Sequence, residues 1–282
     1  MLLRAFAKIN LDLRILGKRP DGYHELQTEL QTIDWFDEIH IDRASGFQFS
    51  ATDGPTDKTN LVVRAVRAFE QATGVRADVK IELIKNIPSG AGLGGGSADA
   101  AVTFLGLQRV FETNVPESEA LHALRSIGSD VPFFLFGGRA CGTGRGDVIY
   151  PVEDRSDYRL VLVNPGVSIV TAEAYSWLTV HDKSNSIEGF RAECVPGSDQ
   201  AEANNDFELP VFARYPQLKA IRDKLLRLGA FRAALSGSGS VVYGQFRTEE
   251  AARITASELG RSYSVKLTKP LSRADYHRRM MD

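Results

Sequence analysis

The 282-residue sequence lacks long apolar runs and has almost no excess of charge. A helix that crosses a bilayer needs about 20 consecutive apolar residues, so we expect no membrane partner. The 34 basic and 36 acidic residues are interspersed and give a net charge of −2. No basic stripe stands out, which argues against a nucleic-acid partner.

Cysteine is also scarce. Cys141 and Cys194 stand far apart and in no metal-ligand spacing. Because we find no secretory pattern at the N-terminus, the sequence predicts a cytoplasmic protein without a disulfide. Hydrophobic residues make up 43% and charged residues 25% of the chain, as in ordinary globular proteins, and the length is sufficient for two domains.

The most informative stretch runs from residue 79 to residue 111 and is typical of a strand, a glycine-rich loop and a helix. The loop contains five glycines, which permit positive φ angles and close approach of phosphate oxygens. Backbone N–H groups of such a loop and the positive end of a helix dipole attract anions. The stretch therefore predicts a phosphate site, with Ser97 near the N-cap of the helix, and disfavours a flexible surface turn.

The loop alone leaves the kind of phosphate site open. No Gly-Lys-Ser/Thr sequence closes it, so it is not a Walker A loop. Residues 90–95 fit G-x-G-x-x-G and Glu112 is spaced like a ribose-binding acid, so a dinucleotide-binding oxidoreductase is an alternative. Against it, Lys85, Asn86 and Pro88 separate the loop from the strand. A non-enzymatic nucleotide-binding module is a further alternative.

Residues 2–16 alternate between apolar and polar side chains, which predicts a long strand with one buried face. Lys8, Asn10 and Asp12 then point the same way, onto a face that is solvated in most strands. Asp130 lies between a helical segment and an apolar one. It is either a helix cap or a functional carboxylate.

The rest of the chain shows further helices and a second loop. Thr171 is expected to cap a helix carrying Tyr175, and residues 236–240 form a second glycine- and serine-rich loop. Residues 184–205 are weakly patterned and expected to be mobile. Helical periodicity covers residues 60–73, 116–127, 218–228 and 249–259, the last of these being the final helix expected.

Three separated motifs together resemble the GHMP small-molecule kinases. They are AKINL with PDGYH near the N-terminus, residues 88–101 with GLGGGSADAA, and residues 235–240. Within that group they are similar to the 4-diphosphocytidyl-2-C-methyl-D-erythritol kinases of non-mevalonate isoprenoid synthesis, over nearly the full length. The resemblance implies an α+β fold of two domains, each a two-layer α/β unit. Residues 1–152 would bind ATP, residues 153–282 would contribute to substrate binding, and the active site would lie in the cleft between them.

The resemblance also implies the reaction. ATP, with Mg²⁺, would phosphorylate the 2-hydroxyl of a small-molecule acceptor, 4-diphosphocytidyl-2-C-methyl-D-erythritol, giving the 2-phosphate and ADP. Another GHMP kinase activity is the nearer alternative, and the oxidoreductase is the more distant one.

Site residues follow from the same resemblance. Lys8 and Asp130 match the catalytic pair, and Asn10 matches a substrate contact. The positions that hold the cytidine diphosphate part are matched by Tyr23, His24, Thr171 and Tyr175. Tyr175 stands where some relatives have phenylalanine, and a stacking role survives that change.

The ATP site is implied in the same way. Asn60 and Lys85 match residues that line the adenosine pocket. Ala98 replaces a serine of some relatives, which leaves Ser97 as the hydroxyl expected nearest to Mg²⁺ or phosphate. The ATP loop itself is matched by Pro88, Ser89, Gly90, Ala91, Gly92, Leu93, Gly94, Gly95, Gly96, Ser97 and Ala98.

Overall fold

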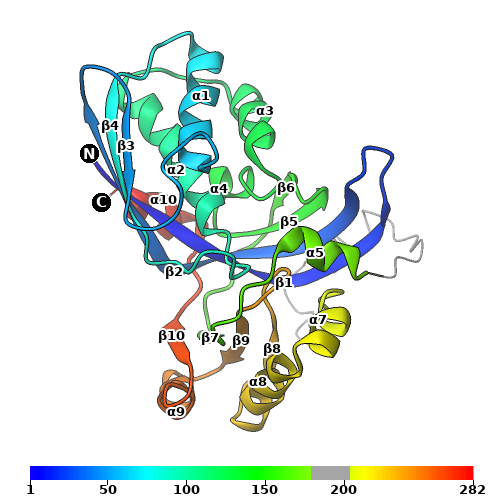
Figure 1. The fold of residues 1–282 in the computed structure, drawn as a ribbon. Helices are drawn as coiled ribbons and strands as arrows, with labels where there is room; N and C mark the ends of the chain where they lie inside the picture. Colours follow the sequence, from blue (N-terminus) through cyan, green and yellow to red (C-terminus); the bar gives the residue numbers. More distant parts are fainter. Residues whose placement is uncertain (179–203, 282) are drawn as a thin grey trace.

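The structure is a computed structural model that describes residues 1–178 and 204–281, and its α+β chain builds two sheets (Figure 1). The first sheet has six strands in the order β3-β4-β2-β5-β6, with β1 paired to β2. The second sheet has the order β10-β7-β9-β8. The strands are β1 (Leu2–Lys18), β2 (His24–Arg43), β3 (Gln48–Ala51), β4 (Val79–Ile84), β5 (Arg139–Gly144), β6 (Val148–Pro151), β7 (Arg159–Asn164), β8 (Arg232–Leu235), β9 (Val242–Phe246) and β10 (Ser264–Thr268).

Helices cover one face of each sheet, so the predicted pair of two-layer units is confirmed (Figure 1). Helices α1 to α4 lie over the first sheet, and α8 and α9 pack on the second. The helices are α1 (Leu61–Thr73), α2 (Gly95–Val110), α3 (Glu117–Ile127), α4 (Phe133–Phe136), α5 (Thr171–Ser176), α7 (Glu208–Arg214), α8 (Pro216–Arg227), α9 (Glu249–Leu259) and α10 (Arg273–Met280).

The side chains of β7 alternate between two apolar clusters, and this shows how the two units pack together. Val161 and Val163 belong to the apolar cluster of the second unit, under α8 and α9. Leu160 and Leu162 point the other way and pack with Ile9 of β1 in a third cluster between the two sheets. Burial on both faces of the second sheet therefore holds it against the first unit.

Helix caps explain where α1 begins and ends. The Asn60 side chain accepts a hydrogen bond from the Val62 N–H at 2.9 Å, which caps the first turn. Gly74 ends the helix with φ of 69°, a left-handed conformation that glycine adopts without strain. The predicted boundaries of this helix are confirmed.

The pairing of β1 with β2 is irregular at three places. The register shifts between Phe6 and Lys8, between Asn10 and Asp12, and near the end of β1. Lys8 and Asn10 are buried and contact each other, so the expectation that they lie on a solvated face is wrong. Asp12 does not join them: its carboxylate pairs with Arg14 at 3.0 Å. A bulge adds one residue to a strand and redirects the following side chains.

Three other expectations need correction. Helix α10 lies beyond the expected last helix and returns to the first unit, where the Tyr276 hydroxyl donates to the Phe134 carbonyl at 2.5 Å. Val170, not Thr171, is the N-cap of α5. Cys141, buried in β5, is disulfide-bonded, which contradicts the expected free thiols; Cys194 lies outside the described residues.

Most of the weakly patterned segment, residues 184–203, also falls outside the described part of the chain. In the part that is described, no helix combines the length and the apolar character that a membrane span requires.

Candidate active site

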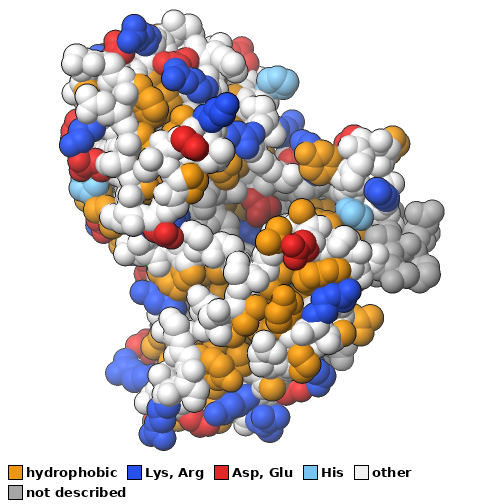
Figure 2. All heavy atoms as spheres, in the orientation of Figure 1, with side chains coloured by type: hydrophobic (Ala, Val, Ile, Leu, Met, Phe, Trp, Pro, Cys, Tyr) orange, Lys and Arg blue, Asp and Glu red, His pale blue; other side chains and the backbone are white. Residues whose placement is uncertain are grey.

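A cavity of about 890 Å³ lies between the glycine-rich loop, β1 and α5. Figure 2 shows the surface hollowed between the two lobes of the molecule. All but one of the residues predicted for the site line this cavity. The exception is Ala98, which is fully buried. The predicted residues that line it, among others, are Lys8, Asn10, Tyr23, His24, Asn60, Lys85, Pro88, Ser89, Gly90, Ala91, Gly92, Leu93, Gly94, Gly95, Gly96, Ser97, Asp130, Thr171 and Tyr175.

The glycine-rich loop has the backbone geometry that its composition predicts. Gly90, Gly92 and Gly94 have φ angles of 67°, 77° and 69°, where other residues would be strained. Gly94 is the N-cap of α2, so Ser97 lies in the first helical turn and is not the cap. No described side chain caps this end of the helix. Its first N–H groups therefore face the cavity and can bind an anion.

Gly96 is the loop glycine that leaves the most room for a side chain. A Cβ atom added there would find Leu61 Cδ1 at 3.7 Å as its nearest neighbour, an ordinary contact. At Gly94 it would meet Lys8 Cε and Phe134 Cζ at 3.0 and 3.1 Å, and at Gly95 it would meet Ile87. A bulkier residue at Gly94 or Gly95 would thus strain the protein, whereas at exposed Gly96 it would fill only the cavity.

Lys8 and Asp130 meet at the floor of the cavity. Lys8 Nζ lies 3.4 Å from Asp130 Oδ2 and donates to Asn10 Oδ1 at 2.7 Å and to the Gly92 carbonyl at 3.0 Å. The Lys8 side chain is 4% exposed and that of Asp130 is 42% exposed. The cation is therefore fixed by the protein, while the carboxylate is open to a ligand.

Asp130 does not act as a helix cap. The following helix, α4, has Pro132 as its N-cap, and no described side chain caps it. This geometry favours the functional carboxylate over the capping alternative.

Lys85 belongs to a buried ionic cluster that the sequence did not reveal. Its ammonium group donates to Asp37 and, at 2.7 Å, to Asp99 Oδ2. Burial disfavours the ammonium, but Asp99 and Asp37 outweigh it and raise the pKa of Lys85. Burial also raises the pKa of Asp99, against the opposing effect of Lys85. Asp37 additionally accepts the Ile87 N–H at 2.7 Å, so the cluster ties the start of the loop to β2 and α2. The helical position of Asp99 was visible in the sequence, but nothing local paired it with Asp37.

Aromatic side chains line the other end of the cavity. The rings of His24 and Tyr175 stack with centroids 4.9 Å apart, and Phe207 packs edge-on against Tyr175 at the same distance. Burial, with a smaller contribution from Lys18, lowers the pKa of His24, so its ring is neutral near pH 7. This flat, partly apolar surface suits a planar ring.

Two further side-chain contacts lie at this end of the cavity. The Arg145 guanidinium lies 4.7 Å from the centre of the Tyr23 ring, a cation–π contact that the sequence did not predict. The Thr171 hydroxyl lies 3.1 Å from that of Ser238, in the second glycine- and serine-rich loop. Residues from both units thus meet at this end of the cavity.

The dinucleotide-binding alternative fails on geometry. Glu112 follows the far end of α2, and a 16-residue helix is roughly 24 Å long. The carboxylate therefore cannot reach a ribose held at the loop. In a Rossmann unit the strand that follows the helix lies beside the strand before the loop and parallel to it. Here β2 separates β5, the first strand after α2, from β4 and pairs antiparallel with both, and β4 pairs in parallel with β3, which comes before it in the chain.

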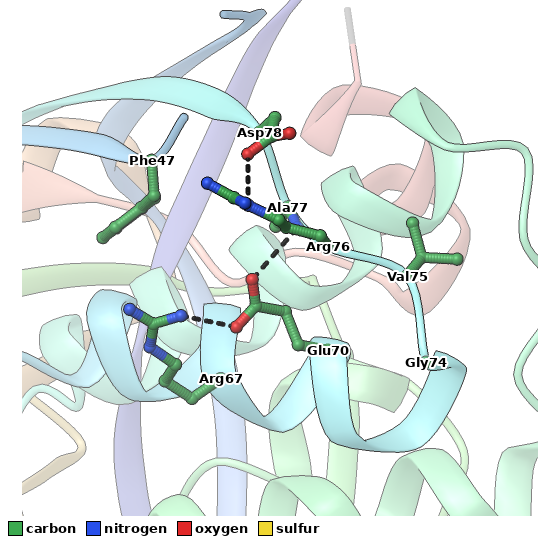
Figure 3. A pocket seen from close by; sticks show the side chains of 8 residues that line it. All are labelled: Phe47, Arg67, Glu70, Gly74, Val75, Arg76, Ala77 and Asp78. Atoms are coloured by element: carbon green, nitrogen blue, oxygen red, sulfur yellow. Dashed lines mark hydrogen bonds and ion pairs between the residues drawn. The ribbon is translucent and has the colours of Figure 1, made fainter. Parts of the chain in front are cut away.

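A second surface pocket, of about 590 Å³, lies between the end of α1 and the start of β4 (Figure 3). Arg67 pairs with Glu70 at 2.6 Å and Arg76 pairs with Asp78 at 2.8 Å. Glu70 also accepts the Ala77 N–H at 3.0 Å. The four charged side chains thus pair with one another within this pocket.

No group of three or more histidine, cysteine or acidic side chains in the described ranges could hold a metal ion by itself. Ser97 offers a hydroxyl at the edge of the glycine-rich loop.

Comparison with known proteins extends this picture. Two protein-family models match: GHMP kinases N terminal domain over residues 60–138, and GHMP kinases C terminal over residues 195–265. The chain is 43% identical over 276 residues to a protein of Solibacter usitatus named 4-diphosphocytidyl-2-C-methyl-D-erythritol kinase, covering 94% of this chain and 87% of that protein. It is 38% identical to a Chlorobium phaeobacteroides protein of the same name, covering 95% of this chain and 96% of the other.

Solved structures agree with the sequence comparison. A crystal structure of 4-(cytidine 5'-diphospho)-2C-methyl-D-erythritol kinase is similar with a TM-score of 0.82 and 32% identity, covering 96% of this chain and 99% of the other. A mevalonate kinase from Methanococcus jannaschii has a TM-score of 0.70 at 15% identity, covering 96% and 98%. The second likeness shows the fold alone.

Proposed function

Since this chain belongs to the GHMP kinases and, within them, to the 4-diphosphocytidyl-2-C-methyl-D-erythritol kinase family, we propose that it performs the reaction of that family. It transfers the terminal phosphoryl group of ATP to the 2-hydroxyl of 4-diphosphocytidyl-2-C-methyl-D-erythritol, in the non-mevalonate isoprenoid pathway. We place the reaction in the cytoplasm, where ATP is abundant, with a small molecule as partner and no nucleic acid.

The observation that carries this proposal is the convergence of three elements on one cavity. The uncapped N-terminus of α2 and its glycine loop offer N–H groups to the ATP phosphates. The Lys8–Asp130 pair lies beside that loop, at 3.4 Å. The aromatic pair of His24 and Tyr175 lies at the acceptor end. Phosphoryl transfer depends mainly on alignment and charge neutralisation, which such an arrangement provides.

The two catalytic residues have different tasks. Asp130, the exposed partner, accepts a hydrogen bond from the acceptor hydroxyl and takes its proton as the phosphoryl group arrives. Lys8 neutralises charge that develops on the phosphoryl oxygens. Asn10 holds the ammonium of Lys8 and lies close enough to contact the acceptor.

ATP takes the loop side of the cavity. Residues 88–97 surround the phosphates, Ala98 supports the loop from the buried side, and Asn60 and Lys85 line the adenosine end. Mg²⁺, bound with ATP, would be held by phosphate oxygens and Ser97 and would neutralise phosphate charge.

The acceptor takes the aromatic side. Tyr23, His24 and Tyr175 surround the cytosine ring, and Thr171 binds the diphosphate. In this arrangement residues 1–152 supply the ATP site, and residues 153–282 contribute Thr171 and Tyr175 to the acceptor site. Helix α10, although it belongs to the second half of the chain, packs into the apolar core of the first unit.

ADP release from MgATP tests the proposal, measured with purified protein and a panel of acceptors. The panel contains 4-diphosphocytidyl-2-C-methyl-D-erythritol, methylerythritol phosphate, mevalonate and homoserine. We expect stoichiometric ADP with the first compound and background rates with the others. Faster release with mevalonate or homoserine would assign the chain to another GHMP activity, and release with none of them would refute the proposal.

A further inference from the structure

The hydroxyl of Thr28 occupies an unusual place next to the catalytic pair. Thr28 lies on β2 opposite Leu13, beside the bulge that separates Asn10 from Asp12 on β1. It is buried, at 3% exposure, and borders the cavity. Its Oγ1 donates to the Asp12 carbonyl at 2.7 Å and accepts from Asn10 Nδ2 at 2.8 Å.

The directions of these two hydrogen bonds are fixed by chemistry. A hydroxyl has one hydrogen, and the Asp12 carbonyl can only accept, so that hydrogen is used there. Thr28 can then only accept from Asn10, which must turn its NH₂ group toward the hydroxyl. The amide oxygen of Asn10 is left facing Lys8 Nζ, to which it is bonded at 2.7 Å.

The bulge explains why a side chain is needed at this point. An extra residue interrupts the ladder of backbone hydrogen bonds between two strands. The Thr28 hydroxyl satisfies one carbonyl on the bulged strand, that of Asp12. From the second unit, the Tyr243 hydroxyl donates to the Asn10 carbonyl at 2.9 Å. Asn10 is thus held at its backbone by one unit and at its side chain by the other.

We propose that Thr28 is a positioning residue for phosphoryl transfer, which acts through Asn10 to fix the ammonium group of Lys8 against Asp130. This inference rests on the proposed function of the same site. Thr28 touches neither reacting group in the structure: the described hydrogen bonds of its side chain go to Asn10 and Asp12. Its effect is therefore indirect.

Thr28→Val tests the inference, because valine keeps the shape and removes the hydroxyl. The Asn10 amide then loses its acceptor, and Lys8 is no longer held in one place. We expect kcat to fall between about ten- and 100-fold, since a misplacement of 1 Å can cost about 10²-fold. KM for ATP should change little because the phosphates are bound by the N-terminus of α2. Thr28→Ser retains the hydroxyl and should restore most of kcat.

Thr32→Val is the matched control. Thr32 lies on the same strand and is also buried, and its hydroxyl accepts the Gly138 N–H at 3.0 Å. It does not border the cavity. Both valine variants should lower the melting temperature, but only Thr28→Val should lower kcat in the folded protein. Should Thr28→Val fail to fold, Thr28→Cys replaces the hydroxyl by a weaker thiol, and its kcat should fall between those of wild type and the predicted valine value.

The outcomes separate this inference from the function it rests on. If wild type releases ADP with the acceptor but Thr28→Val keeps wild-type kcat, the positioning role is refuted. Equal losses of kcat in Thr28→Val and Thr32→Val, or no recovery in Thr28→Ser, would refute it as well. If wild type itself shows no acceptor-dependent turnover, the proposed function is wrong, whatever Thr28 does.

Discussion

At the scale of single residues, the proposed catalytic pair is asymmetric. Lys8 makes contacts with Asn10, Gly92 and Asp130 and is almost fully buried, whereas Asp130 is 42% exposed. The protein therefore fixes the cation before any ligand arrives and leaves the carboxylate open to a ligand. Pre-organised charge of this kind stabilises a transition state without reorganisation during the reaction.

Asp130→Asn should lower kcat by about 10²–10⁴-fold, because it removes the group that accepts the hydroxyl proton. KM for ATP should change far less. The melting temperature should stay within a few degrees, because Asp130 is half-exposed and caps no described helix. Initial rates at saturating MgATP and a thermal melt check this.

Asp53→Asn is the control for that experiment. Asp53 also borders the cavity and accepts only a long hydrogen bond of 3.3 Å from Ser89 among its described partners. The same loss of charge at Asp53 should leave kcat near the wild-type value. A near-normal kcat in Asp130→Asn would remove Asp130 from the reaction.

Tyr175→Ala should weaken acceptor binding. Stacking of a base on an aromatic ring is worth about 1–3 kcal/mol, which corresponds to a rise of about five- to 150-fold in KM for the acceptor. KM for ATP should stay constant. Tyr175→Phe keeps the ring and should behave as wild type. An alanine variant with an unchanged acceptor KM would show that the base does not stack there.

At the scale of elements, the glycine-rich loop and the caps of α1 could be predicted because their chemistry is local. Asn60 and Gly74 act on neighbouring residues, and positive φ angles follow from glycine itself. The turn of Asp12 away from Asn10 could not be predicted, because the bulge depends on how β1 pairs with β2. Helix α10 was missed because it is short and is stabilised by tertiary contacts such as that of Tyr276 with Phe134.

Gly96→Ala should weaken ATP binding without destabilising the fold. Alanine favours a helix over glycine by up to about 1 kcal/mol, and the new Cβ meets only Leu61 at 3.7 Å. The melting temperature should therefore stay equal or rise. The methyl group would stand where phosphate oxygens approach, so KM for ATP should rise, by about tenfold or more for the larger Gly96→Val.

The acceptor KM serves as the internal control for both Gly96 variants, because the aromatic end of the cavity lies away from α2. Unchanged ATP kinetics in Gly96→Val would show that the phosphates do not bind at the N-terminus of this helix.

At the scale of the whole molecule, the site lies where the two units meet, and both units contribute residues to it. The first supplies the glycine-rich loop, Lys8 and Asp130, and the second supplies α5 and the loop at 236–240. The resemblance in sequence predicted which residues line the cavity. It could not predict that the rings of His24 and Tyr175 contact each other directly, since they come from different units.

This stacked pair means that a bound cytosine must either separate the two rings or stack outside them. A ring that stacks on the face of the base cannot hydrogen-bond to its edge, so the edge must be read by other polar groups that line the cavity. Cytosine and uracil present opposite donor and acceptor orders on that edge. A site built to bond one of them leaves its own polar groups unpaired with the other.

The ratio of kcat/KM for 4-diphosphocytidyl-2-C-methyl-D-erythritol to that for its uridine analogue tests the central claim most directly. Both acceptors carry the same reacting hydroxyl and the same diphosphate, so only the base differs. A cytidine-reading kinase should prefer the first by about tenfold or more. Equal values would contradict the account, because they would show that the protein phosphorylates the acceptor without recognising its cytidine.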